Sequence, residues 1–339
     1  MRILAIETSC DETALSLMDA LGGLRSPRFK IIRQTVSSQV KLHAPFGGVV
    51  PMLAKREHAK NLPLLLKKLS PNTDYLILNT DLIAVTVGPG LEPALWEGIN
   101  FAKNLATKCK KPVLGVNHLD GHIYSNWIKP LNKKQTIKFP AVCLIASGGH
   151  TILTLMTSLT KWKILGATRD DAVGECFDKV ARMLKLPYPG GPEIEKHASR
   201  GNEDAIAFPS PMLDQKNFDF SYSGLKTSVL YYLRDHKKVN KNEVAASFQK
   251  AAFLSLIKKS IRAAAVYRAQ SVLLCGGVAS SRYLRRRLAT AARRAGLSFH
   301  APGMKLNTDN ASMIAAAAYI NWLQKKKPLS LRADGNLNI

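Results

Sequence analysis

The feature that most constrains the fold is a pattern that occurs once in each half of the chain. In the first half, apolar runs at Ile3–Thr8 and Ala14–Leu17 are separated by a short polar turn. In the second half, Ala141–Ala146 and Thr151–Met156 are separated in the same way. Two short apolar runs joined by a tight turn are typical of a β-hairpin, and strand–helix–strand patterning follows each pair. We therefore expect a duplicated α/β domain with a cleft between two lobes.

The remaining elements follow from apolar periodicity. Strands are predicted at 30–36, 82–87, 112–116 and 272–275, and helices at 52–69, 91–107, 243–268, 279–295 and about 309–324. The stretch Lys129–Lys134 has the composition of a linker. We expect a first lobe over residues 1–132 and a second over 133–339, with the last helix packing at the cleft between them.

Three small-residue turns follow apolar strands in this pattern. They are Thr8-Ser9-Cys10-Asp11, Ser147-Gly148-Gly149-His150 and Gly276-Gly277-Val278-Ala279. Such turns let backbone N–H groups approach phosphate oxygens, although a single glycine in a turn more often serves only a positive φ. The chain has no GxxxxGK[ST] motif and no GxGxxG motif after a strand, which argues against a P-loop or Rossmann site.

The balance of charge predicts a polyanionic partner. Lys and Arg number 49 and Asp and Glu number 24, giving a net charge of +25. Nucleic acid is the first expectation and an anionic membrane the second, and basicity that serves only solubility is the alternative. Basic clusters at Lys108–Lys111, Arg285–Arg287, Arg293-Arg294 and Lys325–Lys327 are solvated helix faces individually and a phosphate-binding stripe if they share a side.

The five cysteines and the absence of long apolar runs indicate a cytoplasmic protein. The cysteines are far apart and form no CxxC pair, which argues against a disulfide framework. No apolar run approaches the ~18–20 residues of a membrane span, so no membrane-spanning segment is expected, which argues against a membrane partner.

The sequence NHLDGH is the sharpest local feature. On a helix, His118 and His122 share one face and can bind one metal ion. Asp309, at the start of the last predicted helix, is a candidate third ligand, and its alternative role is that of an N-cap. Two histidines and a carboxylate suit Fe(II) or Zn(II) acting as a Lewis acid, whereas one capping and one packed histidine is the alternative interpretation. Leu119 stands where an HExxH protease has its glutamate, so peptide hydrolysis is disfavoured.

The motifs taken together resemble the bacterial TsaD family, the tRNA N6-adenosine threonylcarbamoyltransferases once labelled glycoproteases. The matching segments are IETSCDET, HAPFGGVVPMLAKREH, GPGL, NHLDGH, ASGGHT, GECFDKVARMLKLPYPGGP, FSYSGLKT, CGGVAS and NTDNA. They occur in the family's order from residue 1 to about residue 325. The resemblance implies an actin, Hsp70 and sugar-kinase-like fold made of two ribonuclease H-like lobes.

The resemblance also implies an activity and its partners. The family transfers a threonylcarbamoyl group from L-threonylcarbamoyl-adenylate to N6 of adenosine 37 in tRNAs that read ANN codons, and releases AMP. It implies one Fe2+ per subunit, with zinc as the alternative, and the anticodon stem-loop of tRNA as the nucleic acid. A TsaB-like paralogue and a TsaE-like small ATPase are the implied protein partners.

The resemblance also implies which residues of this sequence occupy the family's functional positions. His118, His122 and Asp309 match the family's metal ligands. The adenylate-binding positions of the family match Ile145, Ala146, Ser147, Gly148, Gly149, Asp178, Gly191 and Ser281. Glu195 matches a ribose contact of archaeal relatives, and Ser281 replaces the asparagine that contacts the nucleotide in the family. No general base is evident, and Asp11 and Glu12 are the candidates.

Two other classes of function remain open at this point. An ATP-dependent kinase or ATPase of the same fold would use the same turns but would leave the histidine pair without a role. A non-enzymatic nucleic-acid-binding protein would explain the charge but not the ordered motifs.

Overall fold

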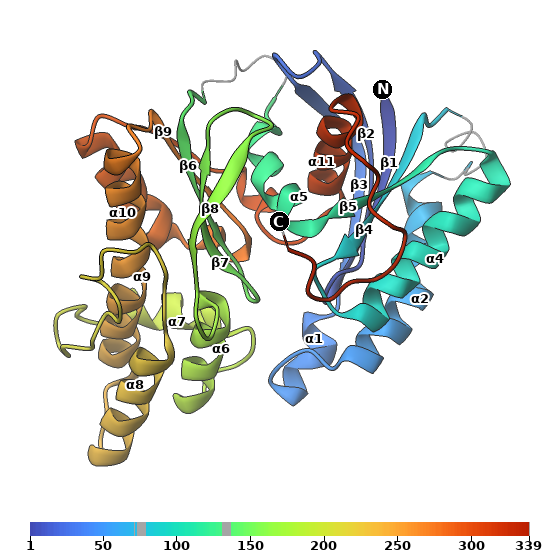
Figure 1. Cartoon of the computed structure of the whole chain (residues 1–339). Coiled ribbons are helices and arrows are strands. Elements are labelled where there is room, and N and C mark those ends of the chain that lie inside the picture. Colours follow the sequence, from blue (N-terminus) through green and yellow to red (C-terminus); the bar gives the residue numbers. More distant parts are fainter. Residues whose placement is uncertain (71, 73–78, 131–136, 339) are drawn as a thin grey trace. The chain divides into compact units, whose positions relative to one another are not determined.

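The computed structural model describes residues 1–70, 72, 79–130 and 137–338, and the chain forms two compact units. Unit 1 comprises Met1–Gln135 and Pro302–Ile339, and unit 2 comprises Thr136–Ala301. The linker expected after Pro130 lies outside the described residues. Each unit has its own five-stranded sheet (Figure 1).

The sheet of unit 1 has the order β3-β2-β1-β4-β5. Its strands are β1 (Arg2–Glu7), β2 (Glu12–Leu21), β3 (Arg28–Ser38), β4 (Leu82–Gly88) and β5 (Val113–Asn117). The pairs β1–β2 and β2–β3 are antiparallel, and β1–β4 and β4–β5 are parallel. The expected hairpin is therefore present and longer than predicted, because β2 extends beyond the predicted run Ala14–Leu17 at both ends.

Helices cover both faces of this sheet. Among its described residues, unit 1 has the α-helices α1 (Val40–His43), α2 (Pro51–Leu69), α4 (Glu92–Cys109), α5 (His118–Tyr124) and α11 (Ala311–Leu323). Leu4 and Ile6 of β1 share one core with residues of α2 and α4, whereas α11 packs on β1, β2 and α5 (Figure 1). Alternate residues of a strand face opposite sides, so β1 is buried on both faces.

Unit 2 repeats the topology of unit 1 strand for strand. Its strands are β6 (Ala141–Ala146), β7 (Thr151–Met156), β8 (Trp162–Ala167), β9 (Ser271–Cys275) and β10 (Ser298–His300), in the order β10-β9-β6-β7-β8. The pairs β6–β7 and β7–β8 are antiparallel, and β6–β9 and β9–β10 are parallel. The predicted duplication of an α/β domain is confirmed.

The helices of unit 2 complete its core. They are α6 (Val173–Met183), α7 (Gly190–Ala198), α8 (Ser223–Asp235), α9 (Lys241–Val266) and α10 (Arg282–Arg294). Phe177 of α6 packs against Phe248 and Phe253 of α9, with ring centroids 4.8 and 4.9 Å apart. This cluster lies against Val142 and Leu144 of β6 and fixes the strand that leads into the second small-residue turn.

The prediction that residues 133–339 form one lobe is wrong for its last part. Residues 302–339 belong to unit 1, because α11 is buried there on nearly every side. Ser312 Oγ lies 2.7 Å from Ser16 Oγ of β2, and the Tyr319 hydroxyl accepts a hydrogen bond of 3.1 Å from Gly23 N. The chain thus returns to its first unit after completing the second. No helix among the described residues is long and apolar enough to cross a membrane.

Candidate metal centre and substrate loops

The histidine pair lies on α5, which begins directly after β5. Asn117 ends the strand and caps the helix, because its side-chain oxygen accepts a hydrogen bond of 2.8 Å from Leu119 N. His118 and His122 are one turn apart, with ring centroids 4.6 Å apart and ring planes nearly perpendicular. Both side chains are buried. The spacing therefore places two imidazoles on one face of a buried helix, as predicted.

The carboxylate of Asp309 completes the group. Its Oδ1 lies 3.4 Å from His118 Nε2 and 3.3 Å from His122 Nε2. Asp309 is not the N-cap of α11, because Asn310 has that role and accepts a hydrogen bond of 3.1 Å from Met313 N. The Asp309 carboxylate is thus available to a metal, and the ligand atoms of the three residues lie within 4.8 Å of one another.

Glu7, which no sequence motif singles out, orients His118. This residue ends β1, is fully buried, and places Oε2 3.1 Å from His118 Nδ1. Ser9 N and Thr86 Oγ1 donate hydrogen bonds of 2.6 and 2.5 Å to the Glu7 carboxylate. A metal-bound histidine usually donates its second ring N–H to a carboxylate or a carbonyl. The contact between Glu7 and Nδ1 therefore leaves Nε2 of His118 free to bind a metal. The signal in the sequence was a glutamate ending an otherwise apolar strand.

The charges of the group favour a cation. Burial alone would raise the pKa values of Glu7 and Asp309, but the His118 charge and its hydrogen bonds lower both. Burial opposes the charge on His118, yet Asp309 and Glu7 raise its pKa well above the usual range. Burial lowers the pKa of His122, which is neutral. Two ionised carboxylates therefore flank one imidazolium, whose proton a divalent metal can replace.

The unpaired ring nitrogens of His122 are a second observation that supports a metal ion at this site. Among the described residues, neither ring nitrogen of His122 has a hydrogen-bond partner, and its Nε2 has the Asp309 carboxylate 3.3 Å away. Buried polar atoms are rarely unpaired in proteins, so the unpaired Nε2 of His122 indicates that a further group binds there. Two imidazoles and one carboxylate that leave open positions suit Fe(II) or Zn(II).

The first small-residue turn reaches this centre. Ser9 Oγ lies 3.1 Å from His118 Nδ1, and His58 of α2 holds the turn through a 2.9 Å contact between its Nε2 and the Cys10 carbonyl. Burial, followed by the charges of Asp309 and Asp11, raises the pKa of Glu12 to about 10. Glu12 is therefore protonated at neutral pH, which disfavours it as the general base.

The second and third turns meet in unit 2. A Cβ on Gly276 would lie 2.3 Å from the carbonyl oxygen of Ala146, so only glycine allows this approach. The first turn of α6 also packs here, because Gly174 N donates a hydrogen bond of 3.2 Å to the Ser147 carbonyl. Gly148 and Gly149 are exposed. Two turns and a helix N-terminus thus gather. The N–H groups of Val173 and Gly174 are bonded within the protein, so the exposed turn at Gly148 and Gly149 is the part that can offer backbone N–H groups to an anion.

The other predicted substrate residues form two separate contacts in unit 2. Asp178 Oδ1 accepts a hydrogen bond of 2.7 Å from Gly190 N, which ties α6 to the first turn of α7 beside Gly191. Ser281 is the N-cap of α10 and donates a hydrogen bond of 3.1 Å to Glu195 Oε1. Glu195 also accepts a hydrogen bond of 2.8 Å from Tyr283 N. Ser281 thus has a structural role, as a cap and as a partner of Glu195, that the sequence alone does not indicate.

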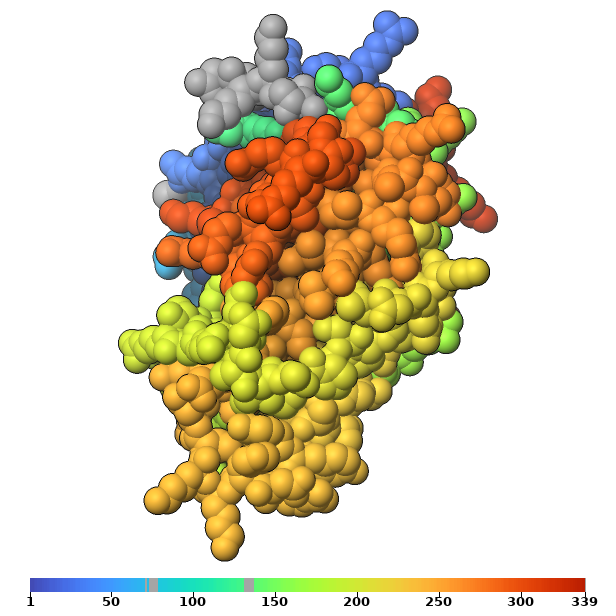
Figure 2. Space-filling view, turned by 90° about the vertical axis from the view of Figure 1, so that its left-hand side faces the viewer, coloured from blue at the N-terminus to red at the C-terminus, as the bar shows by residue number. Residues whose placement is uncertain are grey.

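Helix α10 carries six arginines and no acidic residue. Arg282, Arg286 and Arg293 are exposed and lie within about 40° of one another around the helix axis, over about 16 Å of its length. No acidic side chain in the described part of the chain forms an ion pair with any of the three. In Figure 2 the deep-orange segment of the chain, which includes α10, lies at the surface. We call the three residues the arginine stripe.

Two similar units with this strand order define a protein of the actin, Hsp70 and sugar-kinase fold class, here with a candidate metal centre in unit 1. Solved structures agree on the fold alone. Full-length HypF aligns with a TM-score of 0.58 at 13% identity, covering 98% of this chain and 56% of that protein. Component A of (R)-2-hydroxyglutaryl-CoA dehydratase from Acidaminococcus fermentans aligns with a TM-score of 0.52 at 13% identity, covering 94% and 98%.

The chain belongs to the TsaD family, whose profile, described as tRNA N6-adenosine threonylcarbamoyltransferase, matches residues 30–316. Relatives with that name are similar over their full length. The protein of Thermosipho melanesiensis is 44% identical over 339 residues, which cover 100% of both chains. The protein of Moorella thermoacetica is 46% identical over 340 residues, which cover 99% of this chain and 96% of that one.

Proposed function

We propose that this protein is an acyltransferase that moves the threonylcarbamoyl group of L-threonylcarbamoyl-adenylate to N6 of adenosine 37 in tRNAs reading ANN codons. Family membership over the full length supports the activity. The observation that carries the proposal is the convergence of His118, His122 and Asp309, the positions of the family's metal ligands, on one buried point.

The reaction needs positioning more than a strong nucleophile. A new bond forms between N6 and the carbamoyl carbon, and the bond from that carbon to the phosphate oxygen of the adenylate breaks. AMP leaves with the bonding electron pair, and N6 loses one proton. Because the mixed anhydride is already activated, orientation and stabilisation of developing negative charge supply most of the catalysis.

The centre in unit 1 would hold one Fe2+ per subunit, with Zn2+ as the alternative. His118 and His122 would bind it through Nε2 and Asp309 through a carboxylate oxygen, with Glu7 holding the His118 ring from its other side. When bound, such an ion supplies Lewis-acid polarisation of an oxygen. His122 is neutral and Asp309 is ionised, and these are the protonation states in which an imidazole and a carboxylate bind a metal ion.

Residues of unit 2 would bind the adenylate. The turn from Ile145 to Gly149 would provide backbone N–H groups, and the N-terminus of α6 beside it favours negative charge. Asp178 and Gly191 would bind the nucleoside. Ser281 would act through Glu195, which it orients, in place of the direct amide contact of relatives.

The tRNA and the protein partners follow from the same family. The net charge of +25 supports binding of an anticodon stem-loop, in which adenosine 37 can be displaced from its neighbours. We further propose a cytoplasmic enzyme that works with a TsaB-like paralogue and a TsaE-like small ATPase. A kinase or ATPase of the same fold is not proposed, because it would leave the three converging ligands without a use.

The proposal is tested with purified protein together with its TsaB-like and TsaE-like partners, synthetic L-threonylcarbamoyl-adenylate and an unmodified tRNA transcript. One equivalent of modified adenosine should form for each AMP released, and a transcript with guanosine at position 37 should give neither product. AMP release that continues at the same rate with that control transcript would show that the tRNA is not the acceptor.

A further inference from the structure

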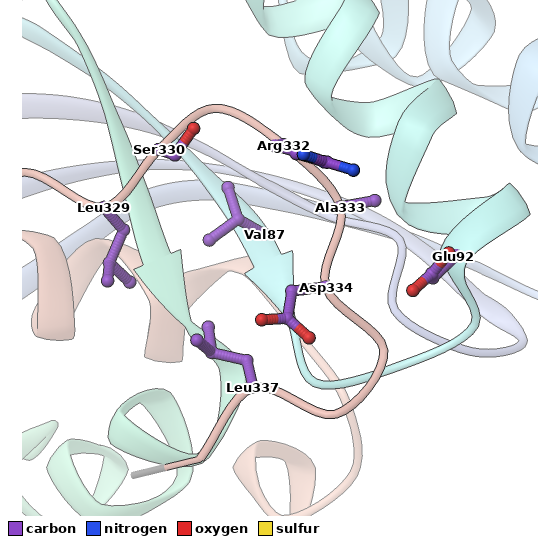
Figure 3. A pocket seen from close by; sticks show the side chains of 8 residues that line it. All are labelled: Val87, Glu92, Leu329, Ser330, Arg332, Ala333, Asp334 and Leu337. Atoms are coloured by element: carbon purple, nitrogen blue, oxygen red, sulfur yellow. The ribbon is translucent and has the colours of Figure 1, made fainter.

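We propose that the last residues of the chain position the metal-binding helix through Asn117. The C-terminal strap, residues 329–338, runs across the ends of β4 and β5 in unit 1 (Figure 3). Leu329 pairs with Gly115 of β5, and Asp334 N donates a hydrogen bond of 2.9 Å to the Val87 carbonyl of β4. Gly335 N donates one of 3.2 Å to Glu92 Oε1 at the start of α4.

The sheet is shaped to receive this strap. A Cβ on Gly88 would lie 2.0 Å from the Asp334 carbonyl oxygen, and one on Gly115 would lie 3.2 Å from that of Leu329. Ala333 of the strap is only 7% exposed and belongs to the core of unit 1, and Leu331 and Leu337 pack beside it. A pocket of about 470 Å³ remains between the strap and the sheet, so the side chains of the strap do not pack against the sheet along its whole length. Backbone hydrogen bonds and a few apolar side chains therefore hold the strap in place.

The end of the strap reaches the residue next to the first metal ligand. Asn117 Nδ2 donates a hydrogen bond of 3.0 Å to the carbonyl oxygen of Asn338. The other half of the same amide caps α5 through Leu119 N. Reversing the amide would set its oxygen against the Asn338 carbonyl, so the strap fixes the orientation in which Asn117 caps the helix. Through that cap the strap sets the position of His118, and its role rests on the metal centre proposed above.

The test is Co2+ binding to metal-free protein, followed by visible absorption and by titration to a dissociation constant. Asn117→Asp keeps an oxygen that caps α5 but removes the donor to the strap. Its added negative charge would by itself strengthen cation binding, so weaker binding must come from lost positioning. Asn336→Asp is the matched control, because it makes the same chemical change at an exposed strap position.

We expect Asn117→Asp to weaken Co2+ binding by about tenfold or more and to change its spectrum, as outer contacts of metal ligands commonly do. Deletion of residues 329–339 should have the same effect, and Asn336→Asp none. Wild-type affinity and spectrum in Asn117→Asp would overturn the proposal, whatever the deletion does to folding. A Co2+ spectrum of the wild type that His118→Ala leaves unchanged would instead overturn the metal assignment, and the role of the strap with it.

Discussion

Removing the arginine stripe should weaken tRNA binding in a way that salt reveals. The perturbation is Arg282→Ala, Arg286→Ala and Arg293→Ala together. All three side chains are exposed on one side of α10, opposite the buried Leu284 and Leu288, so the core of unit 2 keeps its contacts. If each arginine neutralises one phosphate, the slope of log K against log salt falls by roughly 2 to 3.

That slope sets the size of the effect. Between 50 and 200 mM salt, the wild type should lose roughly 20- to 40-fold more affinity than the variant. Fluorescence anisotropy of a labelled tRNA at several salt concentrations measures both constants. The matched control is Arg56→Ala, Lys67→Ala and Lys68→Ala on the exposed side of α2, which removes the same charge from unit 1. Equal slopes for the stripe variant and the wild type, or equal losses in both triple variants, would refute specific docking on α10.

Three other predictions follow from individual side chains. His118→Ala should lower bound metal by more than about tenfold, measured by elemental analysis, and lower turnover with it. Ser281→Ala should reduce the free energy of unfolding by about 1 kcal/mol because the cap of α10 is lost, whereas Ser281→Asn should keep that free energy unchanged. Calorimetry with a non-hydrolysable adenylate analogue should show a larger loss of binding for Asp178→Ala than for either Ser281 variant. Lys259 is fully buried and donates to the Asp219 carbonyl, and burial, followed by repulsion from Arg262, lowers its pKa to about 8. The unfolded chain therefore binds more protons than the folded chain between about pH 8 and 10.5. The cost of burying the charged lysine is thus complete below pH 8 and decreases above it. Lys259→Met should increase the free energy of unfolding by up to roughly 3 kcal/mol at pH 7 and by about half that at pH 9.5, and an equal gain at both pH values in denaturant unfolding would contradict the assignment.

The sequence predicts the local parts of this structure well. Both hairpins were predictable because alternating apolar runs and small-residue turns encode them within about 15 residues. The shared face of His118 and His122 follows from helical spacing alone. The position of Asp309 beside them does not, since it depends on where α11 packs.

The destination of α11 is the main structural fact that the sequence conceals. Its sequence ASMIAAAAYINWL has no polar side, so apolar periodicity gives no direction for packing. Position in the chain then suggests the second lobe, whereas small side chains let the helix pack closely on the sheet of unit 1. Adjacent Asp309 and Asn310 are both good N-caps, and local sequence does not decide between them. Only the fold shows that Asn310 caps and Asp309 faces the histidines.

The most direct test of the central claim is the content of threonylcarbamoyl-adenosine in tRNA from a strain that lacks this gene. Mass spectrometry of digested tRNA should show the modification lost in the deletion and restored by the wild-type gene. The His122→Ala and Asp309→Ala genes should fail to restore it, although both proteins accumulate. Modified tRNA at wild-type levels in the deletion strain, or full restoration by either variant, would contradict a transferase that works through this metal centre.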